Sequence, residues 1–233
     1  MAGVTSTEYR QYRFQVPPGA TEVFLVRHGE SAPTGPASPP PSWQGQDDPP
    51  LAPEGRHQAE QLGRRLAVEP LDAIYVTPLQ RTHQTAAPLA ARLGLEPRVV
   101  EDLREVHLGE WEGGLFRMHS HQLHPTALQV FAEERWDVIP GAETNEQLQE
   151  RTTRALQKIH ADHPDERVAV FAHGGVIGAL LARVSGARPF AFVGADNGSV
   201  SQLVVLGEHV TLRRFNDTAH LDPRFTLVPE PLD

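Results

Sequence analysis

Short apolar runs alternate with segments of helical spacing along most of this chain. Apolar runs occupy residues 22–26, 71–76 and 167–173, and each is followed, directly or after a loop, by a segment whose apolar residues recur every three or four positions. Strands buried on both faces are continuous apolar runs, and strands that alternate with helices form a mainly parallel sheet covered on both sides. The pattern predicts an α/β fold, a three-layer α/β/α sandwich with a mainly parallel central sheet.

Residues that begin and end helices support this interpretation. Pro53 and Pro78 lie near the start of two helical segments, Gly94 ends the second, and Thr144 with Gln147 has the spacing of a capping box. The expected helices cover residues 51–67, 78–94, 144–163 and 174–186. A short strand is expected at 98–101, and a terminal β-hairpin over 200–206 and 209–215.

The chain is expected to form one domain with two polar ends. Residues 1–20 resemble an arm that closes on the turn sequence VPPGA, residues 21–216 form the domain, and residues 217–233 form a tail. Within the domain, residues 31–50 are rich in Pro, Gly and Ser and predict a long loop, either an ordered lid or a mobile segment. Residues 113–140 predict a helical insertion or cap.

Composition excludes several classes of partner and site. The formal net charge of −9 argues against nucleic acid or an anionic membrane as the main partner, since both favour basic surfaces. The absence of cysteine excludes disulfides, thiolate zinc sites and a cysteine nucleophile. Residues 1–20 lack the continuous apolar core of a signal peptide, and no apolar run is long enough to cross a bilayer, so a cytoplasmic protein is expected.

Two of the apolar runs end in histidine followed by glycine. His28 follows VFLVR, and His173 follows VAVFA. Ligands of parallel α/β sheets bind where strands end and helices begin. A neutral histidine there can attack a phosphate monoester, the preceding Arg27 can donate to two phosphate oxygens, and Gly29 lets the backbone approach the ligand.

Two further stretches supply groups that such a reaction needs. Arg81 lies on the first turn of an expected helix, where free backbone N–H groups also favour an anion. The stretch LREVHLGEWEG contains Glu105, Glu110 and Glu112, any of which could protonate a leaving oxygen. Composition alone does not choose among these three carboxylates.

Five stretches in fixed order resemble one known family. LVRHGES, LAPEGRHQA, TPLQRTHQTA, LREVHLGEWEG and VAVFAHGGVI, spread over about residues 22 to 206, are similar to motifs of the histidine phosphatase superfamily. The similarity is to the branch that contains cofactor-dependent phosphoglycerate mutase and related phosphatases. The resemblance implies a phosphoglycerate mutase-like fold and a small phosphorylated substrate.

The resemblance also implies roles for individual residues. His28 matches the histidine that becomes phosphorylated, and Arg27, Arg81 and His173 match the residues that bind the phosphate. Glu105 matches the acid that protonates the leaving oxygen. If these roles hold, His28 must be neutral and Glu105 protonated, which predicts an acidic to neutral pH optimum.

Other positions favour a phosphatase over a mutase. Gly174 matches a glycine whose backbone N–H faces the phosphate, whereas Thr34 stands where the mutases usually have asparagine. The insertion at 113–140 lacks the basic set with which the mutases bind phosphoglycerate. The resemblance therefore implies a phosphomonoesterase without a metal or cofactor; 2,3-bisphosphoglycerate would be needed only by a mutase. The family resemblance also suggests that the chain forms a homodimer.

Three alternatives remain open on the sequence. One is a phosphoglycerate mutase, and another is a non-catalytic protein that binds a phosphorylated ligand on the same fold. The third is a zinc hydrolase, because His119, His121 and His124 are close in sequence and neutral imidazole binds zinc well. Trp43 and Trp111 are candidates for stacking on a ligand.

Overall fold

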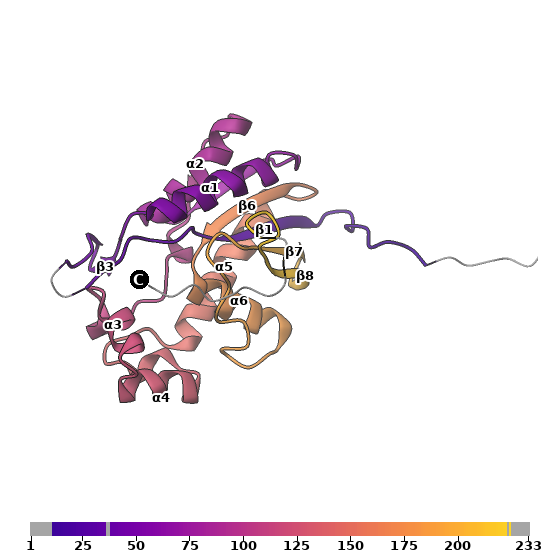
Figure 1. Cartoon of the computed structure of the whole chain (residues 1–233). Coiled ribbons are helices and arrows are strands. Elements are labelled where there is room, and N and C mark those ends of the chain that lie inside the picture. The colour runs from indigo at the N-terminus through magenta and orange to yellow at the C-terminus, as the bar shows by residue number, and fades with distance from the viewer. Residues whose placement is uncertain (1–10, 36–37, 223, 225–233) are drawn as a thin grey trace, which may run out of the picture.

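The computed structural model describes residues 11–35, 38–222 and 224 of the chain. A six-stranded sheet lies at its centre (Figure 1). Its strands are β1 (Thr21–Arg27), β4 (Ala73–Val76), β5 (Arg98–Val99), β6 (Arg167–Ala172), β7 (Val200–Leu206) and β8 (His209–Asp217). In the order β5-β4-β6-β1-β7-β8, the first four are parallel, and β7 and β8 form an antiparallel hairpin. The predicted mainly parallel sheet is confirmed.

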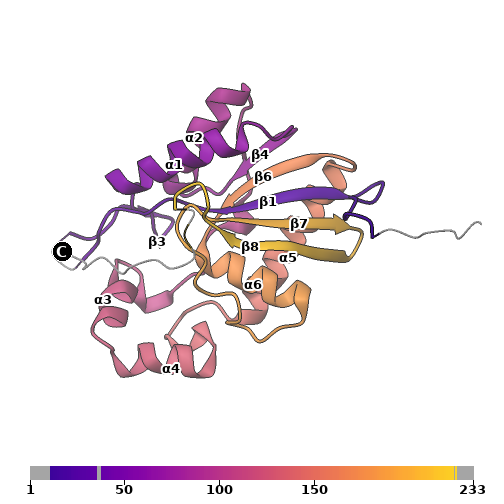
Figure 2. The ribbon, with the colours of Figure 1, turned by 45° about the vertical axis from the view of Figure 1, so that its right-hand side comes forward.

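Helices cover both faces of the sheet, as predicted. Helices α1 (Pro53–Leu66) and α2 (Gln80–Leu93) lie on one face, and α5 (Asn145–Asp162) and α6 (Gly174–Ser185) lie on the other (Figures 1 and 2). Gly94 ends α2 with a left-handed φ of 66°, and Thr144 and Gln147 exchange both hydrogen bonds of a capping box. The end signals in the sequence therefore act as expected.

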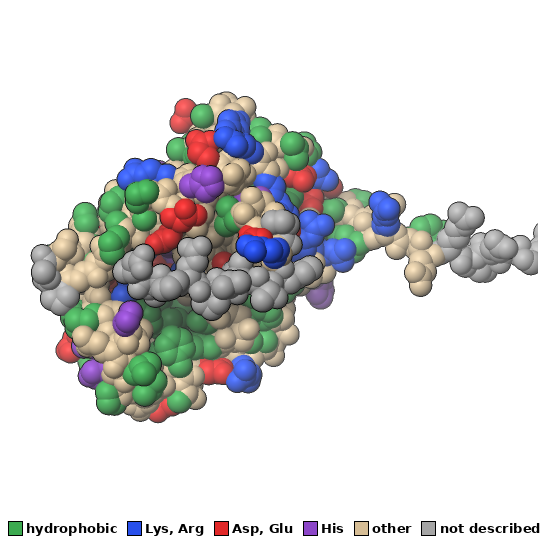
Figure 3. Space-filling view, viewed as in Figure 1, with side chains coloured by type: hydrophobic (Ala, Val, Ile, Leu, Met, Phe, Trp, Pro, Cys, Tyr) green, Lys and Arg blue, Asp and Glu red, His purple; other side chains and the backbone are tan. Residues whose placement is uncertain are grey.

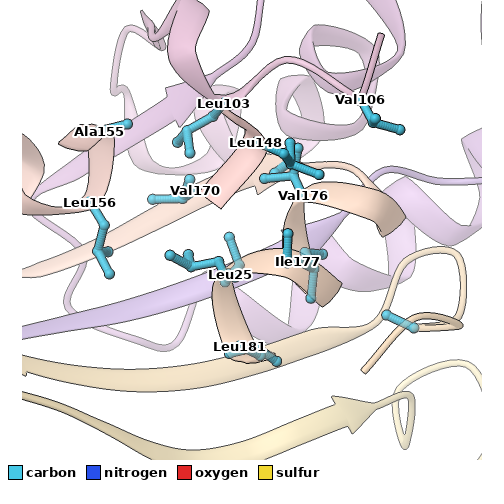
Figure 4. Close-up of a cluster of buried hydrophobic side chains, with 14 of the residues drawn as sticks. Leu25, Leu103, Val106, Leu148, Ala155, Leu156, Val170, Val176, Ile177 and Leu181 are labelled. Atoms are coloured by element: carbon cyan, nitrogen blue, oxygen red, sulfur yellow. The ribbon is translucent and has the colours of Figure 1, made fainter. Parts of the chain in front are cut away.

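Strand β1 shows how the sheet joins two cores. Val23 and Leu25 belong to the core under α5 and α6, whereas Phe24 and Val26 belong to the core under α1 and α2. Figure 4 shows Leu25 in the first of these, together with side chains of α5 and α6. Burial of both faces explains why the strand is a continuous apolar run.

The segment 31–50 contains a short hairpin where the sequence predicted only a loop. Strands β2 (Ser42–Trp43) and β3 (Gln46–Asp47) pair through a turn at Gln44 and Gly45, both with positive φ. The strands are two residues long, too short to give an alternating pattern. Residues 36 and 37 lie outside the described residues.

The segment 113–140 lies apart from the two helical layers (Figure 2). It forms α3 (Leu115–His121), α4 (Pro125–Glu133) and the 3₁₀ turn η3 (Trp136–Val138), and it follows two other turns, η1 (Glu101–Leu103) and η2 (Gly109–Trp111). None of the helices found in the described part has the length and apolar character needed to cross a membrane. Residues 1–10 of the expected arm, and 223 and 225–233 of the expected tail, lie outside that part.

Candidate active site

The register of two neighbouring strands brings His28 and His173 together. Parallel pairing of β1 with β6 sets Arg27 opposite Ala172, so the two histidines leave the sheet side by side. The backbone N–H of His28 donates to the Ala172 carbonyl at 3.1 Å, and the two imidazole centroids are 5.2 Å apart. These two residues, far apart in sequence, therefore lie next to each other.

The hydrogen bonds of His28 define which ring nitrogen can react. Arg81 Nε donates to His28 Nε2 at 3.2 Å. Because a guanidinium can only donate, Nε2 carries a lone pair. The proton then lies on Nδ1, which donates to the Gly29 carbonyl at 2.7 Å. His28 thus offers an unprotonated Nε2 held in a fixed orientation.

Burial and positive neighbours keep both imidazoles neutral. Burial lowers the pKa of His28 well below its ordinary value, and Arg81 and Arg27 lower it further. Burial and Arg81 likewise lower the pKa of His173, whose Nε2 lies 2.9 Å from the Thr77 hydroxyl. A neutral His28 is what nucleophilic attack requires.

Arg81 is fixed beside His28 by the segment 31–50. It lies on the first turn of α2, and its Nη1 donates to the Asp47 carbonyl at 2.9 Å and lies 3.9 Å from the Asp48 carboxylate. Burial lowers its pKa, and the Glu105 and Asp48 carboxylates offset this only in part. Because the ordinary pKa of arginine lies far above neutrality, the side chain stays charged while aligned with the reactive nitrogen.

Arg27 presents a second guanidinium with unused donor capacity. Its Nη1 donates to the Ala195 carbonyl, while its buried Nε has no hydrogen-bond partner among the described residues. A Cβ at Gly174 would lie 3.3 Å from this Nε, so glycine leaves room for the guanidinium beside the start of α6. An unpartnered buried N–H next to a helix N-terminus suits an anion.

The structure distinguishes the three carboxylates. Glu105 reaches the start of α6, where its Oε2 accepts from Gly175 N–H at 3.3 Å, and a Cβ at Gly175 would lie 2.7 Å from Oε1. Its Oε1 accepts from Val106 N–H at 2.9 Å, so both of its oxygens are partnered, as are those of Glu112, whereas Glu110 is exposed. Glu105 differs from Glu112 because its charge acts on both Arg27 and Arg81, so it is the carboxylate beside the two predicted phosphate-binding arginines.

Sequence reasoning missed the residue that holds the loop of Glu105. Arg151 of α5 donates to the carbonyls of Asp102, Arg104 and Glu105 at 2.8, 2.7 and 3.0 Å, and it pairs with the Glu143 carboxylate at 2.6 Å. The available signal in the sequence was an arginine on the apolar face of the expected helix, because a charge in that position needs partners.

These groups share one cavity of about 460 Å³. Six of the seven predicted site residues line it: Arg27, His28, Thr34, Arg81, Glu105 and Gly174. The seventh, His173, is fully buried and packs against His28 without lining the cavity. Thr34 Oγ1 is buried and has no hydrogen-bond partner among the described residues.

Part of the cavity wall comes from residues to which the sequence assigned no role in the site. Arg117 of α3 lines it together with Phe116, Phe131, Trp136 and Val193. Trp43 and Trp111, the expected stacking candidates, do not line it. Trp111 is buried and packs near Phe116 and His119 instead.

The histidines of the zinc alternative have structural contacts. The rings of His119 and His124 lie 4.7 Å apart and both pack near Trp111. His124 Nδ1 also accepts from Thr126 N–H at 3.2 Å and caps α4. Across residues 11–35, 38–222 and 224, no group of three His, Asp or Glu side chains is placed to hold a metal ion.

Comparison with known proteins agrees with this geometry. The family model of the histidine phosphatase superfamily (branch 1) matches residues 23–218. The chain belongs to this superfamily. It is 36% identical to phosphoglycerate mutase-like protein 4 of Arabidopsis thaliana, over 86% of the chain and 87% of the relative. It is 32% identical to a metal-independent phosphoserine phosphatase of the same plant, over 86% and 83%.

A solved structure extends the likeness to three dimensions. The native structure of a mycobacterial glucosyl-3-phosphoglycerate phosphatase superposes with a TM-score of 0.70 at 26% identity, covering 85% of this chain and all of that one. The family and fold expected from the five sequence motifs are confirmed.

Proposed function

We propose that this protein is a phosphomonoesterase that hydrolyses a small phosphorylated metabolite through a phosphohistidine on His28. The observation that carries the proposal is the unprotonated Nε2 of His28, which accepts from Arg81 while Nδ1 donates to the Gly29 carbonyl, in a cavity that Arg27 and Glu105 also line. Relatives that carry the name of phosphatases support a hydrolase.

The first chemical step transfers the phosphoryl group. His28 Nε2 attacks phosphorus, the P–O ester bond breaks, and the carboxyl of Glu105 gives its proton to the departing oxygen. Arg27 and Arg81 neutralise the charge on the phosphate oxygens as it develops. The phosphorylated imidazole carries a proton on Nδ1, and its bond to the Gly29 carbonyl stabilises that positive charge.

The second step returns the enzyme to its starting state. The Glu105 carboxylate takes a proton from water, the oxygen attacks phosphorus, and the N–P bond breaks. Inorganic phosphate leaves, and His28 and protonated Glu105 are restored. The cycle balances with water as the sole co-reactant, so the proposal includes no metal or organic cofactor.

The proposal is tested with p-nitrophenyl phosphate. His28→Ala should lower kcat/KM by about 10⁴-fold or more, because the covalent route is lost. His209→Ala, which removes an exposed histidine of β8, is the matched control and should retain wild-type rates. Activity of the wild type should persist in a chelator. Wild-type rates in His28→Ala would refute the mechanism, and binding of phosphate without turnover by the wild type would instead indicate a non-catalytic binder.

A mutase is the second candidate, since one relative is named phosphoglycerate mutase-like. Mutase and phosphatase share the first step and differ in whether a substrate hydroxyl or water accepts the phosphoryl group. The assay is interconversion of 2- and 3-phosphoglycerate with and without 2,3-bisphosphoglycerate. We expect hydrolysis to exceed interconversion under both conditions.

The proposal includes a cytoplasmic location and a homodimer. The first is the expectation drawn from the sequence, in which no apolar run has the length of a membrane span. The second rests on family resemblance. Light scattering of the purified full chain tests it, and a monomeric mass across the micromolar range would contradict it.

A further inference from the structure

Aromatic rings from separate elements form a continuous wall beside the phosphate-binding groups. The centroids of Phe116 and Trp136 lie 5.8 Å apart, those of Trp136 and Phe190 lie 4.8 Å apart, and those of Phe190 and Phe131 lie 6.1 Å apart. Phe116, Phe131 and Trp136 line the same cavity as His28. Rings at such separations stabilise one another and keep a defined shape.

The 188–194 segment, which carries Phe190 and Val193, is also held in place by contacts with α6 and α4. Val193, which lines the cavity, packs so closely on α6 that a Cβ at Gly178 would lie 2.9 Å from its side chain. The Glu134 carboxylate accepts from Phe190 N–H at 3.4 Å and pairs with Arg188 at 2.5 Å, which ties the end of α4 to the 188–194 segment. The wall is therefore formed before a ligand binds.

Phe131 remains partly in water although it belongs to the wall. The residue keeps 48% of its area exposed. In Figure 3 apolar side chains gather at the surface over α3 and α4, the part of the molecule that carries Phe131. A ring that lines a cavity and is also partly exposed to water can be buried further by a ligand that binds in the cavity.

Two carboxylates that line the cavity, those of Asp47 and Glu112, are already engaged. The Asp47 carboxylate accepts from the N–H groups of Gly113 and Gly114 at 2.6 and 2.7 Å. Glu112 accepts from Leu108 and Asp47 N–H at 2.8 and 2.9 Å. Both carboxylates hold the chain around the cavity, and their negative charge disfavours a second anionic group on a ligand.

The cations that line the cavity, within the described part of the chain, are Arg27, Arg81 and Arg117. Arg27 and Arg81 are placed for the phosphate. Arg117 donates to the Ser31 hydroxyl at 2.5 Å and to the Ala32 carbonyl at 3.1 Å, so it holds the segment after His28. A second carboxylate or phosphate on the substrate would meet Arg117 with the negative charges of Asp47 and Glu30 already acting on that arginine.

From these observations we propose that the substrate is the phosphate monoester of an apolar alcohol that carries an aromatic ring or a comparably bulky hydrocarbon group. Its phosphate binds at His28, and its hydrocarbon group packs on Phe116, Phe131, Trp136 and Val193. The inference rests on the proposed phosphatase function and adds the class of the leaving group. It sets this chain apart from relatives whose names specify phosphoserine or glucosyl-3-phosphoglycerate.

The first test compares monoesters of alkyl alcohols, so that leaving-group chemistry stays similar. The wild type should hydrolyse 2-phenylethyl phosphate with a kcat/KM at least about tenfold above that for phosphoserine or 3-phosphoglycerate. Phe131→Ala should remove about tenfold on 2-phenylethyl phosphate through a higher KM and leave phosphoserine within about twofold. Leu128→Ala, an equally exposed apolar residue of α4 outside the cavity, is the matched control and should change neither.

The opposite ranking would overturn the inference. If phosphoserine or 3-phosphoglycerate is the better substrate, and Arg117→Gln rather than Phe131→Ala abolishes that preference, the pocket is built for a second anion.

Equilibrium binding separates this inference from the proposed reaction. By calorimetry, benzylphosphonate should bind the wild type at least about tenfold more tightly than methylphosphonate, and Phe131→Ala should reduce the ratio. Equal affinities would overturn the inference even if p-nitrophenyl phosphate is hydrolysed. Selective binding of benzylphosphonate without turnover of any monoester would retain the apolar subsite and defeat the phosphatase proposal.

Discussion

The two ends of the cavity are built in different ways. The proposed phosphate end consists of residues at strand ends and helix starts, where the backbone sets each position: His28 follows β1, Arg81 lies on the first turn of α2, and Gly174 begins α6. The proposed leaving-group end consists of side chains from α3, α4, η3 and the segment around Val193, whose positions depend on packing between these elements. On the proposed function, residues of the first end carry out the reaction and side chains of the second end select the substrate.

This difference predicts which substitutions should affect every substrate and which should affect only some. A side chain at a strand end is fixed by sheet register, so a substitution there affects every substrate. A side chain in the wall affects the substrates that reach it. The predictions below test this division, from the largest expected effect to the smallest.

Arg81→Met should impair all substrates to a similar degree. The change removes the donor that aligns His28 Nε2 and one of the charges that bind the phosphate. Loss of such a donor costs about 10³-fold in kcat/KM. The measurement is kcat/KM for p-nitrophenyl phosphate and 2-phenylethyl phosphate; a loss confined to one of them would contradict the division between the two ends.

Glu105→Gln should separate substrates by the acidity of the leaving alcohol. An alkyl alcohol needs protonation as it leaves, so 2-phenylethyl phosphate should lose about 10²-fold or more, while p-nitrophenyl phosphate should lose less than about tenfold in the transfer step. Rapid-quench measurement of that step gives both values. Equal losses would show that Glu105 is not the acid.

Arg151→Met should also lower activity more on the alkyl ester than on the p-nitrophenyl ester, but by less than Glu105→Gln does. The change frees the carbonyls of Asp102, Arg104 and Glu105. If Arg151 positions the acid, the alkyl ester should lose more than the p-nitrophenyl ester. A uniform loss would indicate a role in stability alone.

The neutral histidines of the phosphate end should make stability depend on pH. Burial lowers the pKa of His28 and His173 in the folded state, so below about pH 6.5 the unfolded chain binds protons that the folded chain does not. The contribution of the two neutral histidines to the free energy of unfolding is fully present above that pH and is lost as the pH falls below it. Between about pH 7.5 and about pH 5.5 both histidines should therefore contribute to a loss of unfolding free energy.

Urea unfolding at the two pH values measures this effect. His28→Gln and His173→Gln should each reduce the pH dependence, while the control His209→Ala, which removes an exposed histidine, should leave it unchanged. An unchanged dependence in both site variants would show that the two imidazoles are not neutral in the folded protein.

The phosphate end could be predicted from the sequence because its residues follow recognisable local features. An apolar run that ends in Arg27 and His28, and a second that ends in His173 and Gly174, require only that parallel strands lie side by side. The observed pairing of β1 with β6 supplies that condition. The helix limits were also predictable, since Pro53, Gly94 and Thr144 act within one turn of the helix they bound.

The leaving-group end could not be predicted in the same way. Phe116, Phe131 and Trp136 have no shared spacing, and their meeting depends on the packing of α3 and α4 against the segment around Val193. The sequence instead indicates Trp111 as a residue that stacks on a ligand, but Trp111 is buried and does not line the cavity. Tertiary packing, which leaves no local pattern, decides which aromatic side chain meets a ligand.

The most direct measurement is the capture of the covalent intermediate. The wild type is mixed briefly with substrate, quenched in alkali and digested, and the peptide that contains His28 is analysed by mass spectrometry. We predict one added phosphoryl group on His28, stable in alkali and lost in acid, and its absence in His28→Ala. A phosphoryl group on another residue, or complete turnover without any phosphorylated peptide, would contradict the account.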